Sequence, residues 1–215
     1  SVRAKPEAKV RSTLGRYAQL RRDNPELIVV VTGCVAQQLG QSLAGGASGA
    51  DLVVGPDRIA ALPDLIAAVR ADRAPRVATE TTPVADYRFV AAEPTAADGP
   101  QAMLTVMKGC DNFCAYCIVP LVRGREVSKP VAEVVREAER LLAAGAQEIL
   151  LLGQNVNRYR DPAGTTFPAL LHAVGHLPGL ARLRFTTSHP RDCGDDLIAC
   201  FDGRIPTLCE YFHLP

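Results

Sequence analysis

Short apolar runs alternate with amphipathic helical patterns along most of this chain, and this alternation limits the folds it can adopt. The run at 27–31 is continuous and β-branched, as expected of a strand buried on both faces. A helical pattern occupies 7–22 before it, and Asp23-Asn24-Pro25 ends that pattern. Strands that alternate with helices form parallel sheets, and ligands bind at the carboxyl ends of such strands. The sequence therefore predicts an α/β fold.

The same pattern predicts two domains joined by a linker. In the first, a helix, a strand and a helix follow the first strand, at 37–43, 51–54 and 57–70. Four prolines punctuate 73–101, which we interpret as the linker, with one short strand at 87–90. In the second domain, strands at 102–107, 148–152, 182–186 and 210–213 alternate with helices that begin after Ser128, at 166 and at 195. Ser128 is the expected cap of the first of these helices. The predicted domains are 1–72 and 102–215.

Composition narrows the class of protein without identifying a partner. At 215 residues and 47% apolar residues, the chain can bury one ordinary core or two small ones. It has no run of about 18 apolar residues, so we expect neither a transmembrane helix nor a secretory segment. The odd number of 7 cysteines is typical of a reducing compartment, and we expect a cytoplasmic protein without membrane contact.

Three cysteines form a C-x3-C-x2-C motif directly after the strand at 102–107: Cys110, Cys114 and Cys117. Thiolates are soft ligands, and iron–sulfur clusters are usually held by four of them. A compact set of three therefore predicts a cluster with one iron left open for another ligand.

Three other readings of these cysteines are weaker. A redox C-x-x-C normally opens a helix, and Ile118-Val119-Pro120 is a poor helix start. Structural disulfides are disfavoured by the odd cysteine count. A zinc site needs a second ligand pair, and the remaining cysteines of this domain are too scattered to supply one, so we interpret them as structural: Cys193, Cys200 and Cys209.

Basic residues surround the cysteine motif and outnumber the acidic residues Asp111 and Glu126: they are Lys108, Arg123, Arg125 and Lys129. A cationic rim of this kind favours an anionic cofactor or a phosphodiester backbone. An ordinary solvated surface is the alternative interpretation.

The cysteine motif is similar to the signature of radical S-adenosylmethionine enzymes. Five further segments agree in type and order with one branch of these enzymes: 1–10, Thr32-Gly33-Cys34-Val35-Ala36-Gln37, Pro120-Leu121-Val122-Arg123-Gly124, Gly153-Gln154-Asn155-Val156-Asn157 and Thr187-Ser188-His189-Pro190. The end of the chain, Phe212-His213-Leu214-Pro215, also agrees. Over nearly its whole length the chain resembles the radical-SAM methylthiotransferases, in the branch that acts on tRNA.

This resemblance assigns roles to residues. It implies that Cys110, Cys114 and Cys117 hold a [4Fe-4S] cluster whose open iron binds S-adenosylmethionine, and that Cys34 is one ligand of a second, auxiliary [4Fe-4S] cluster. The residues implied to lie beside the bound cofactor are Tyr116, Gly153, Gln154, Asn155, Ser188 and His213. From the residues alone, a cysteine after a strand such as Cys34 is more often a small buried hydrophobe, and the glycine and amides are more often an ordinary turn.

Aromatic and histidine residues leave further alternatives open. Core packing is the other reading of Phe113 and Tyr116. His213 can be a structural histidine. His172 and His176 have the i, i+4 spacing of metal ligands, but no third ligand accompanies them.

The implied activity is methylthiolation of N6-isopentenyladenosine beside the tRNA anticodon, with the tRNA anticodon stem-loop and a single-electron donor such as flavodoxin or ferredoxin as partners. Alternatives are a methylthiotransferase acting on threonylcarbamoyladenosine tRNA or on a ribosomal-protein aspartate, and a non-catalytic metal-binding module that binds RNA.

The implied fold is a methylthiotransferase N-terminal domain followed by a (βα)6 barrel truncated after its fourth strand. We expect the chain to be a fragment that lacks both ends, inactive by itself, of a monomeric enzyme.

Overall fold

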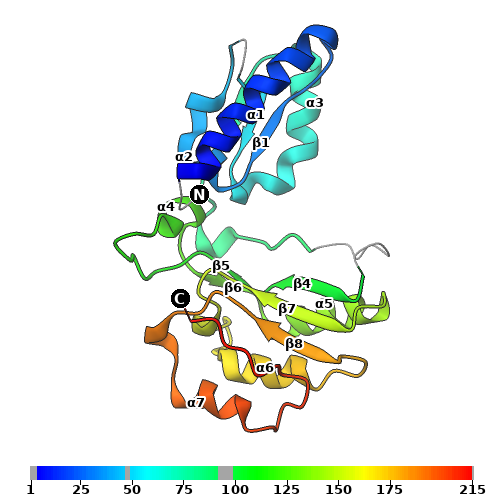
Figure 1. The fold of residues 1–215 in the computed structure, drawn as a ribbon, viewed down its shortest axis with the longest axis vertical. Helices are drawn as coiled ribbons and strands as arrows, with labels where there is room; N and C mark the ends of the chain where they lie inside the picture. Colours follow the sequence, from blue (N-terminus) through cyan, green and yellow to red (C-terminus); the bar gives the residue numbers. More distant parts are fainter. Residues whose placement is uncertain (1–3, 47–48, 92–98, 215) are drawn as a thin grey trace. The chain divides into compact units, whose positions relative to one another are not determined.

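The computed structural model describes residues 4–46, 49–91 and 99–214, and its contacts divide the chain into two compact units (Figure 1). The first unit contains Ser1–Tyr87 together with Asp111–Gly124, and the second contains Arg88–Cys110 together with Arg125–Pro215. The segment after Cys110 thus belongs with the first unit, although the sequence pattern placed it inside the second domain. Within the described residues, no helix has the length and apolar character needed to cross a membrane.

The first unit is built on a parallel sheet in the order β1-β2-β3, with Val30 opposite Leu52 and Leu52 opposite Arg76. Its strands are β1 (Val30–Thr32), β2 (Leu52–Val54) and β3 (Arg76–Ala78). Its helices are α1 (Ala4–Asp23), α2 (Cys34–Leu39), α3 (Leu62–Asp72) and α4 (Val119–Arg123), with 3-10 turns η1 (Gly40–Leu43), η2 (Pro56–Ala61) and η3 (Val84–Asp86).

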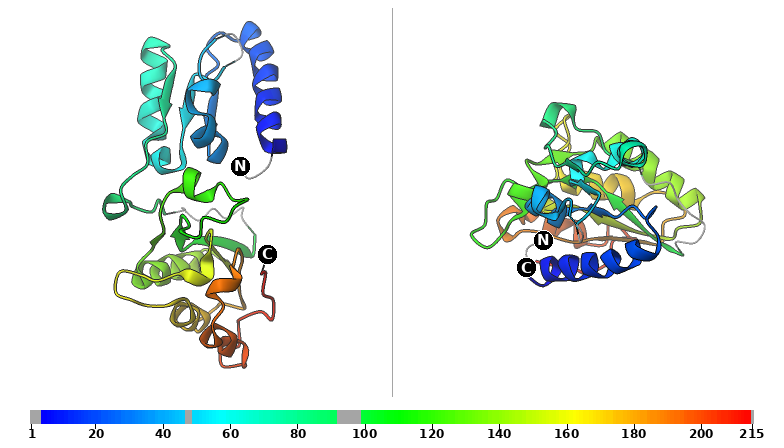
Figure 2. Two further views of the ribbon diagram at one scale, coloured as in Figure 1. Left: turned by 90° about the vertical axis from the view of Figure 1, so that its left-hand side faces the viewer. Right: turned by 90° about the horizontal axis from the view of Figure 1, so that it is seen from above.

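Both faces of β2 are buried, because successive side chains of a strand point to opposite sides. Val53 packs with Leu14 of α1 and Ala36 of α2, whereas Leu52 and Val54 pack with α3. Figure 2 shows α1 and α3 on opposite sides of this sheet. The strand with two buried faces is therefore β2. The strand predicted at 27–31 corresponds to β1, which begins at Val30 and whose residues are half-buried or exposed.

The strand predicted at 87–90 is wrong. The N–H of Tyr87 donates to the carbonyl oxygens of Pro83 and Val84, at 3.1 and 3.4 Å, so this backbone closes a turn at η3 instead of joining a sheet. The strand of this region is β3, which the proline-rich composition of the linker concealed.

The second unit is built on a parallel sheet in the order β4-β7-β8. Its strands are β4 (Gln101–Thr105), β7 (Glu148–Leu152) and β8 (Arg182–Phe185), and a short antiparallel pair joins β5 (Met107–Lys108) to β6 (Val127–Ser128). Its helices are α5 (Val131–Ala143), α6 (Phe167–Gly175) and α7 (Asp195–Ile198), with 3-10 turns η4 (Val156–Arg158), η5 (Pro190–Asp192) and η6 (Ala199–Phe201).

The core of the second unit lies between this sheet and its helices, and α5 contacts α6 (Figure 1). Leu104, Leu151 and Leu183 point into the core from the three strands, and the rings of Phe167 and Phe185 meet edge to face at 5.0 Å. The other face of the sheet is open, since Met103 of β4 is 60% exposed.

The strand predicted at 210–213 is wrong. The chain near it makes one bridge to β8, in which Leu183 donates to the Thr207 oxygen at 2.7 Å and Cys209 donates to the Leu183 oxygen at 3.0 Å. Beyond Cys209 the described backbone forms no strand, and Tyr211 is exposed, whereas the Phe212 ring lies 5.5 Å from the Phe185 ring of β8. Among the described residues, the sheet therefore has three strands.

Two predicted helix starts are also wrong. Pro130, without a side-chain cap, precedes α5, and the Ser128 hydroxyl instead accepts a hydrogen bond from the Arg160 N–H at 3.2 Å. Helix α4 begins at Val119, with Pro120 in its first turn, where a missing N–H removes no helical bond. A helix therefore does follow Cys114 and Cys117, and the poor helix start at 118–120 is no reason to exclude a redox C-x-x-C.

At the amino-terminal end of the sheet, one carboxylate connects all three strands. Glu148 of β7 accepts hydrogen bonds from Gln101 of β4 at 2.6 Å and from Arg182 of β8 at 2.6 Å, and Arg184 lies 3.1 Å away. The bond from Arg182 lowers the pKa of Glu148, burial opposes it, and Gln101 and Arg184 add to the lowering.

We predict that Leu151→Ala lowers the free energy of unfolding by about 2–5 kcal/mol, because it leaves a cavity in the centre of the core. Urea denaturation followed by circular dichroism measures this loss. Met103→Ala on the open face of the same sheet is the control, with an expected change below about 1 kcal/mol. Equal losses in the two variants would contradict the assigned core.

We predict that Glu148→Gln destabilises the protein by about 1–3 kcal/mol at neutral pH, because the charged hydrogen bonds across the strands are weakened. The folded-state pKa is lowered, so this stabilisation is present above the ordinary glutamate pKa and is lost as the pH falls through the lowered value. Urea midpoints measured between pH 3 and 7 should therefore converge for the two proteins at low pH. A constant difference would contradict the prediction.

Candidate cofactor and cluster site

Two buried polar atoms without partners lie just after the carboxyl ends of β7 and β8. Asn155 is 1% exposed, and its amide nitrogen donates to Asp192 at 2.7 Å, but its Oδ1 atom has no hydrogen-bond partner. Ser188 is 4% exposed, and its hydroxyl also lacks a partner. A buried polar group left unpaired costs about 1–3 kcal/mol. Such atoms at strand ends can form hydrogen bonds with a ligand or with ordered water.

The backbone that presents Ser188 is strained and fixed. Thr187 has a φ of 70°, which is unfavourable for a β-branched residue. Its carbonyl oxygen accepts the Val156 N–H at 3.0 Å. Asn157 exchanges two hydrogen bonds of 2.9 Å with the backbone of His189. These contacts tie the loop after β7 to the loop after β8. No sequence pattern indicates these roles of Thr187 and Asn157, although both residues lie in the motifs quoted above.

Gly153 and Gln154 support the segment that leads into the cysteine motif. A Cβ on Gly153 would lie 2.6 Å from Met107 Cγ and 3.3 Å from the Cα of Val156, so only glycine fits between β5 and the loop after β7. The side-chain oxygen of Gln154 accepts the Gly109 N–H at 2.7 Å. Both residues therefore hold the backbone immediately before Cys110.

The three motif cysteines are divided between the units. Cys110 is buried in the second unit, whereas Cys114 and Cys117 are half-buried in the first and share a turn, with the Cys117 N–H donating to the Cys114 oxygen at 2.9 Å. No group of three or more Cys, His, Asp or Glu side chains forms a ready metal site within the described ranges. Among the described residues, which include all seven cysteines, none forms a disulfide.

Cys34 is the first residue of α2 in the first unit. The Arg123 Nε–H, from α4, donates to its sulfur at 3.2 Å, and α2 contacts α4. A charged donor on a sulfur atom is a typical outer partner of a metal-bound thiolate. The structure thus brings Cys34 close to the helix that directly follows Cys114 and Cys117.

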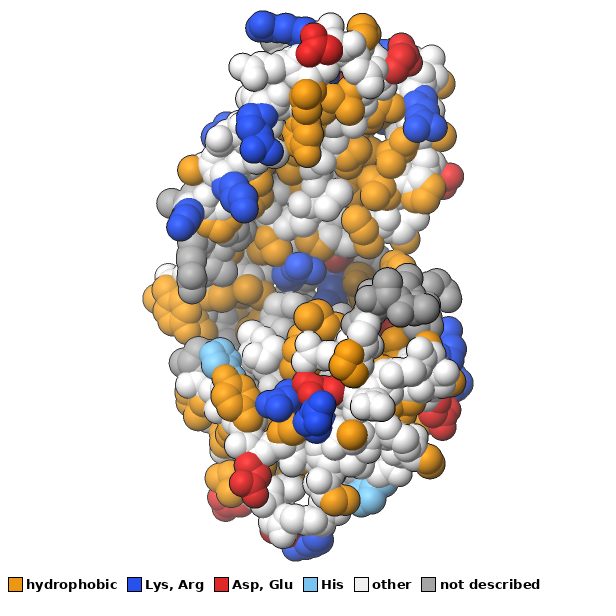
Figure 3. Space-filling model, turned by 45° about the vertical axis from the view of Figure 1, so that its right-hand side comes forward, with side chains coloured by type: hydrophobic (Ala, Val, Ile, Leu, Met, Phe, Trp, Pro, Cys, Tyr) orange, Lys and Arg blue, Asp and Glu red, His pale blue; other side chains and the backbone are white. Residues whose placement is uncertain are grey.

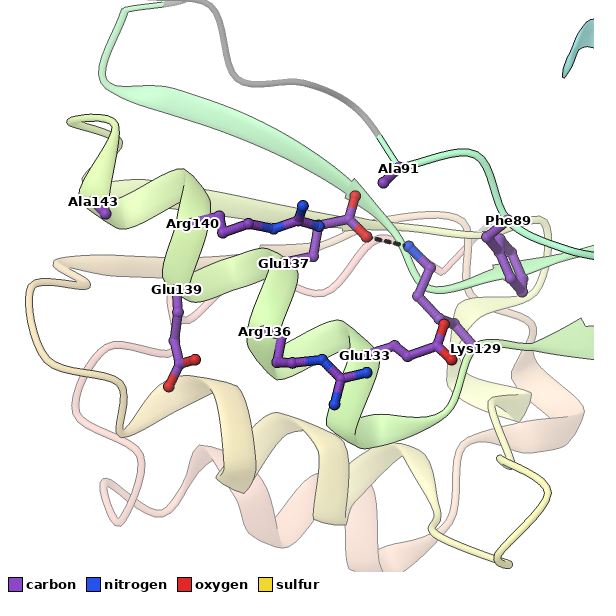
Figure 4. Close-up of a pocket in the computed structure, with 9 residues that line it drawn as sticks. All are labelled: Phe89, Ala91, Lys129, Glu133, Arg136, Glu137, Glu139, Arg140 and Ala143. Carbon is purple, nitrogen blue, oxygen red and sulfur yellow. Dashed lines mark hydrogen bonds and ion pairs between the residues drawn. The ribbon is translucent and has the colours of Figure 1, made fainter.

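The prediction of a basic rim around the cysteine motif is wrong for its two lysines. Lys129 is buried and forms an ion pair with Glu137 of α5, and its ammonium lies 5.2 Å from the centroid of the Phe89 ring (Figure 4). Lys108 is buried as well. On the face drawn in Figure 3, basic and acidic side chains of the second unit lie next to each other.

The aromatic residues of the motif do not belong to a core. Phe113 is 64% exposed with a φ of 46°, and Tyr116 is 76% exposed. Both rings are therefore open to a ligand, and the core-packing reading is wrong. His213 is exposed too.

The remaining candidate ligands have structural contacts. The rings of His172 and His176 stack at 5.9 Å, and both ring nitrogens of His176 face carbonyl oxygens, at 2.8 Å from His172 and 3.1 Å from Arg204. Cys200 is buried and its sulfur donates to the Asp196 oxygen at 3.4 Å, while burial raises the pKa of its thiol.

Two family models match the chain. The Radical SAM superfamily model matches residues 104–203, which include the cysteine motif, Gly153-Gln154-Asn155 and Ser188. The model of the Uncharacterized protein family UPF0004 matches residues 1–55, which include Cys34.

Among curated proteins, the chain is similar to enzymes named tRNA-2-methylthio-N(6)-dimethylallyladenosine synthase. It is 47% identical over 216 residues to that of Anaeromyxobacter sp. (strain Fw109-5), covering 100% of this chain and 46% of the relative. The corresponding values for Stutzerimonas stutzeri (strain A1501) are 43%, 100% and 48%, and for Syntrophotalea carbinolica they are 44%, 100% and 49%. The chain belongs to the radical-SAM methylthiotransferase family. It spans about half the length of these relatives.

Within this family segment, we predict that Gln154→Leu exposes Cys110, because the Gly109 N–H loses its acceptor and the preceding backbone loosens. Alkylation of Cys110 by iodoacetamide, followed by mass spectrometry, should become several-fold faster. Gln147→Leu, an exposed position before β7, is the matched control and should leave the rate unchanged. An unchanged rate in Gln154→Leu would contradict the supporting role of this amide.

Proposed function

We propose that the protein containing this chain methylthiolates tRNA, converting N6-isopentenyladenosine beside the anticodon to its 2-methylthio derivative. The observation that carries the proposal is the similarity of the whole chain to the named synthases. The structure adds support, because Asn155 and Ser188 have unpaired buried polar atoms in the part of the chain that matches the Radical SAM superfamily.

The chain supplies the donor types that a cluster and its cofactor need, although within the described residues these side chains do not form a ready metal site. Cys110, Cys114 and Cys117 supply three thiolates for a [4Fe-4S] cluster, and Cys34 supplies one ligand of the second cluster, with Arg123 on its sulfur. When bound, the cluster and S-adenosylmethionine supply the one-electron chemistry that activates a C–H bond of the substrate.

Side chains at the strand ends and in the cysteine motif would bind and orient the cofactor. The Asn155 Oδ1 atom can accept a hydrogen bond from an amino group, and the Ser188 hydroxyl can donate one to a carboxylate, which are the two polar groups of a methionyl moiety. The exposed Tyr116 ring offers an aromatic surface for an adenine. Gly153 and Gln154 keep the backbone before Cys110 in place.

We further propose that the sheet β4-β7-β8 is part of a (βα)6 barrel. The parallel order of the strands, the helix that follows each of them and the open face at Met103 all support this arrangement. The bridge at Leu208 marks the position where a fourth strand would pair.

The partners follow from this chemistry. A tRNA anticodon stem-loop is the proposed substrate, because a base in a loop is unstacked at lower cost than one in a duplex. A single-electron donor such as flavodoxin or ferredoxin is required to reduce the cluster. We propose a monomeric cytoplasmic enzyme.

We predict that the full-length protein carrying this segment binds about eight irons after anaerobic reconstitution, in two clusters. Joint replacement of Cys110, Cys114 and Cys117 by alanine should remove about four irons and abolish reductive cleavage of S-adenosylmethionine. Iron analysis and low-temperature EPR measure the clusters, and mass spectrometry of tRNA nucleosides detects the 2-methylthio product. Cys200→Ala is the control and should retain both clusters, since this side chain lies in the core of the second unit and its sulfur donates to the Asp196 carbonyl oxygen.

The outcomes separate the proposed function from its alternatives. Methylthiolation of threonylcarbamoyladenosine, or of an aspartate in a ribosomal protein, would change the substrate and retain the chemistry. Bound zinc, or a cluster whose EPR signal does not respond to S-adenosylmethionine, would contradict the enzyme assignment and favour a metal-binding module that binds RNA.

A further inference from the structure

A groove of about 410 Å³ lies in the second unit, between the loop after β7, the loop after β8 and the first turn of α6. Three arginines line it, Arg158 and Arg160 from the first loop and Arg191 from the second. Two carboxylates, Asp192 and Asp196, also line it. Positive charges therefore outnumber negative charges in this groove.

Arg158 and Asp192 belong to the scaffold of the groove. The Nε atom of Arg158 lies 2.9 Å from Glu126, and its Nη1 atom lies 3.8 Å from Asp192. The other carboxylate oxygen of Asp192 accepts the hydrogen bond from Asn155 at 2.7 Å. Because these charges compensate one another, they fix the loops and contribute little attraction for a ligand.

Arg160 and Arg191 have exposed side chains that are not paired in this way. The guanidinium of Arg160 donates to the Gly164 carbonyl oxygen at 3.2 Å, and neither arginine forms an ion pair with a described residue. A guanidinium presents a planar set of N–H donors that matches two oxygens of a phosphate. Two such groups from neighbouring loops therefore favour an anion over a neutral ligand.

The start of α6 adds to this preference. Phe167, its first residue, lines the groove, and the preceding Thr166 makes no side-chain cap. The amino-terminal end of a helix carries partial positive charge, which favours a bound phosphate. The single unmatched carboxylate, Asp196, has an oxygen that accepts the Leu197 N–H at 2.9 Å.

We propose that this groove binds a backbone phosphate of the substrate RNA next to the nucleotide that is modified. The groove lies at the carboxyl-end edge of the sheet, where Asn155 and Ser188 also lie, so it is on the same side of the sheet as a base bound at this edge. The inference rests on the proposed function, which supplies the RNA, and adds the residues that hold its backbone: Arg160, Arg191 and the start of α6.

The test measures binding of an anticodon stem-loop RNA containing N6-isopentenyladenosine to the full-length reconstituted protein, by fluorescence anisotropy at several KCl concentrations. Joint Arg160→Gln and Arg191→Gln replacement should weaken binding about tenfold at low salt and reduce the slope of log affinity against log salt by about 0.7 per lost phosphate contact. Joint replacement of the same residues by lysine keeps the charges and should keep the slope.

Joint Arg136→Gln and Arg140→Gln replacement on the exposed side of α5 is the matched control. It removes the same charge from the same unit and should leave affinity within about twofold of the wild type. Circular dichroism melting checks folding, and exposed substitutions of this type cost little stability.

Unchanged affinity and slope in the glutamine variant, or an equal loss in the control variant, would overturn the groove as a phosphate site. If the wild type still methylthiolates tRNA, the proposed function stands. A wild type that neither binds nor modifies this RNA would overturn both. If the glutamine variant unfolds at a lower temperature than the wild type, the lysine variant provides the test. This variant keeps both positive charges, so a reduced salt slope in a folded lysine variant would contradict the proposal.

Discussion

The parallel pairing of β7 with both β4 and β8 is the constraint on which the candidate site depends. Ala102 lies opposite Ile149, and Ile149 lies opposite Leu183, so the three strands run in one register and end at one edge. A further bond, from the Val106 N–H to the Leu152 oxygen at 3.0 Å, carries the pairing past the end of β4. Because parallel strands direct their following loops to the same edge, the segments before Cys110 and after Leu152 and Phe185 meet there.

A buried polar network secures the approach to this edge. The Lys129 N–H donates to Val106 at 2.8 Å, and the Lys129 carbonyl oxygen accepts the Tyr159 hydroxyl at 2.6 Å. Burial raises the pKa of Tyr159, so this hydroxyl remains a donor throughout the physiological range. The ion pair between Lys129 and Glu137 adds little stability relative to apolar packing. Its value is positional, because it anchors the segment between β6 and α5 against the strand that leads into Cys110.

How much the sequence predicts depends on whether the information is local. The apolar periodicity of α5, α6 and β7 is local, and these elements form where it predicts them. The segment 210–213 has a strand-like composition, but among the described residues the pairing with β8 is limited to the bridge between Leu183 and Leu208. The motifs identified Asn155 and Ser188, whereas the clamp between Asn157 and His189 and the support of Gly109 by Gln154 depend on residues distant in sequence. Contacts between residues distant in sequence leave no periodic pattern in the sequence.

The features of the second unit that oppose its stability gather at the same edge. Thr187 is strained, and Asn155 and Ser188 bury polar atoms without partners, whereas the core behind them is filled by leucine and phenylalanine side chains. Strain and unsatisfied groups persist only where the surrounding packing holds them. A ligand with an amino group and a carboxylate would supply the missing bonds, and an RNA phosphate would neutralise Arg160 and Arg191 beside it. A ligand that forms these bonds would therefore stabilise the folded edge by binding to it.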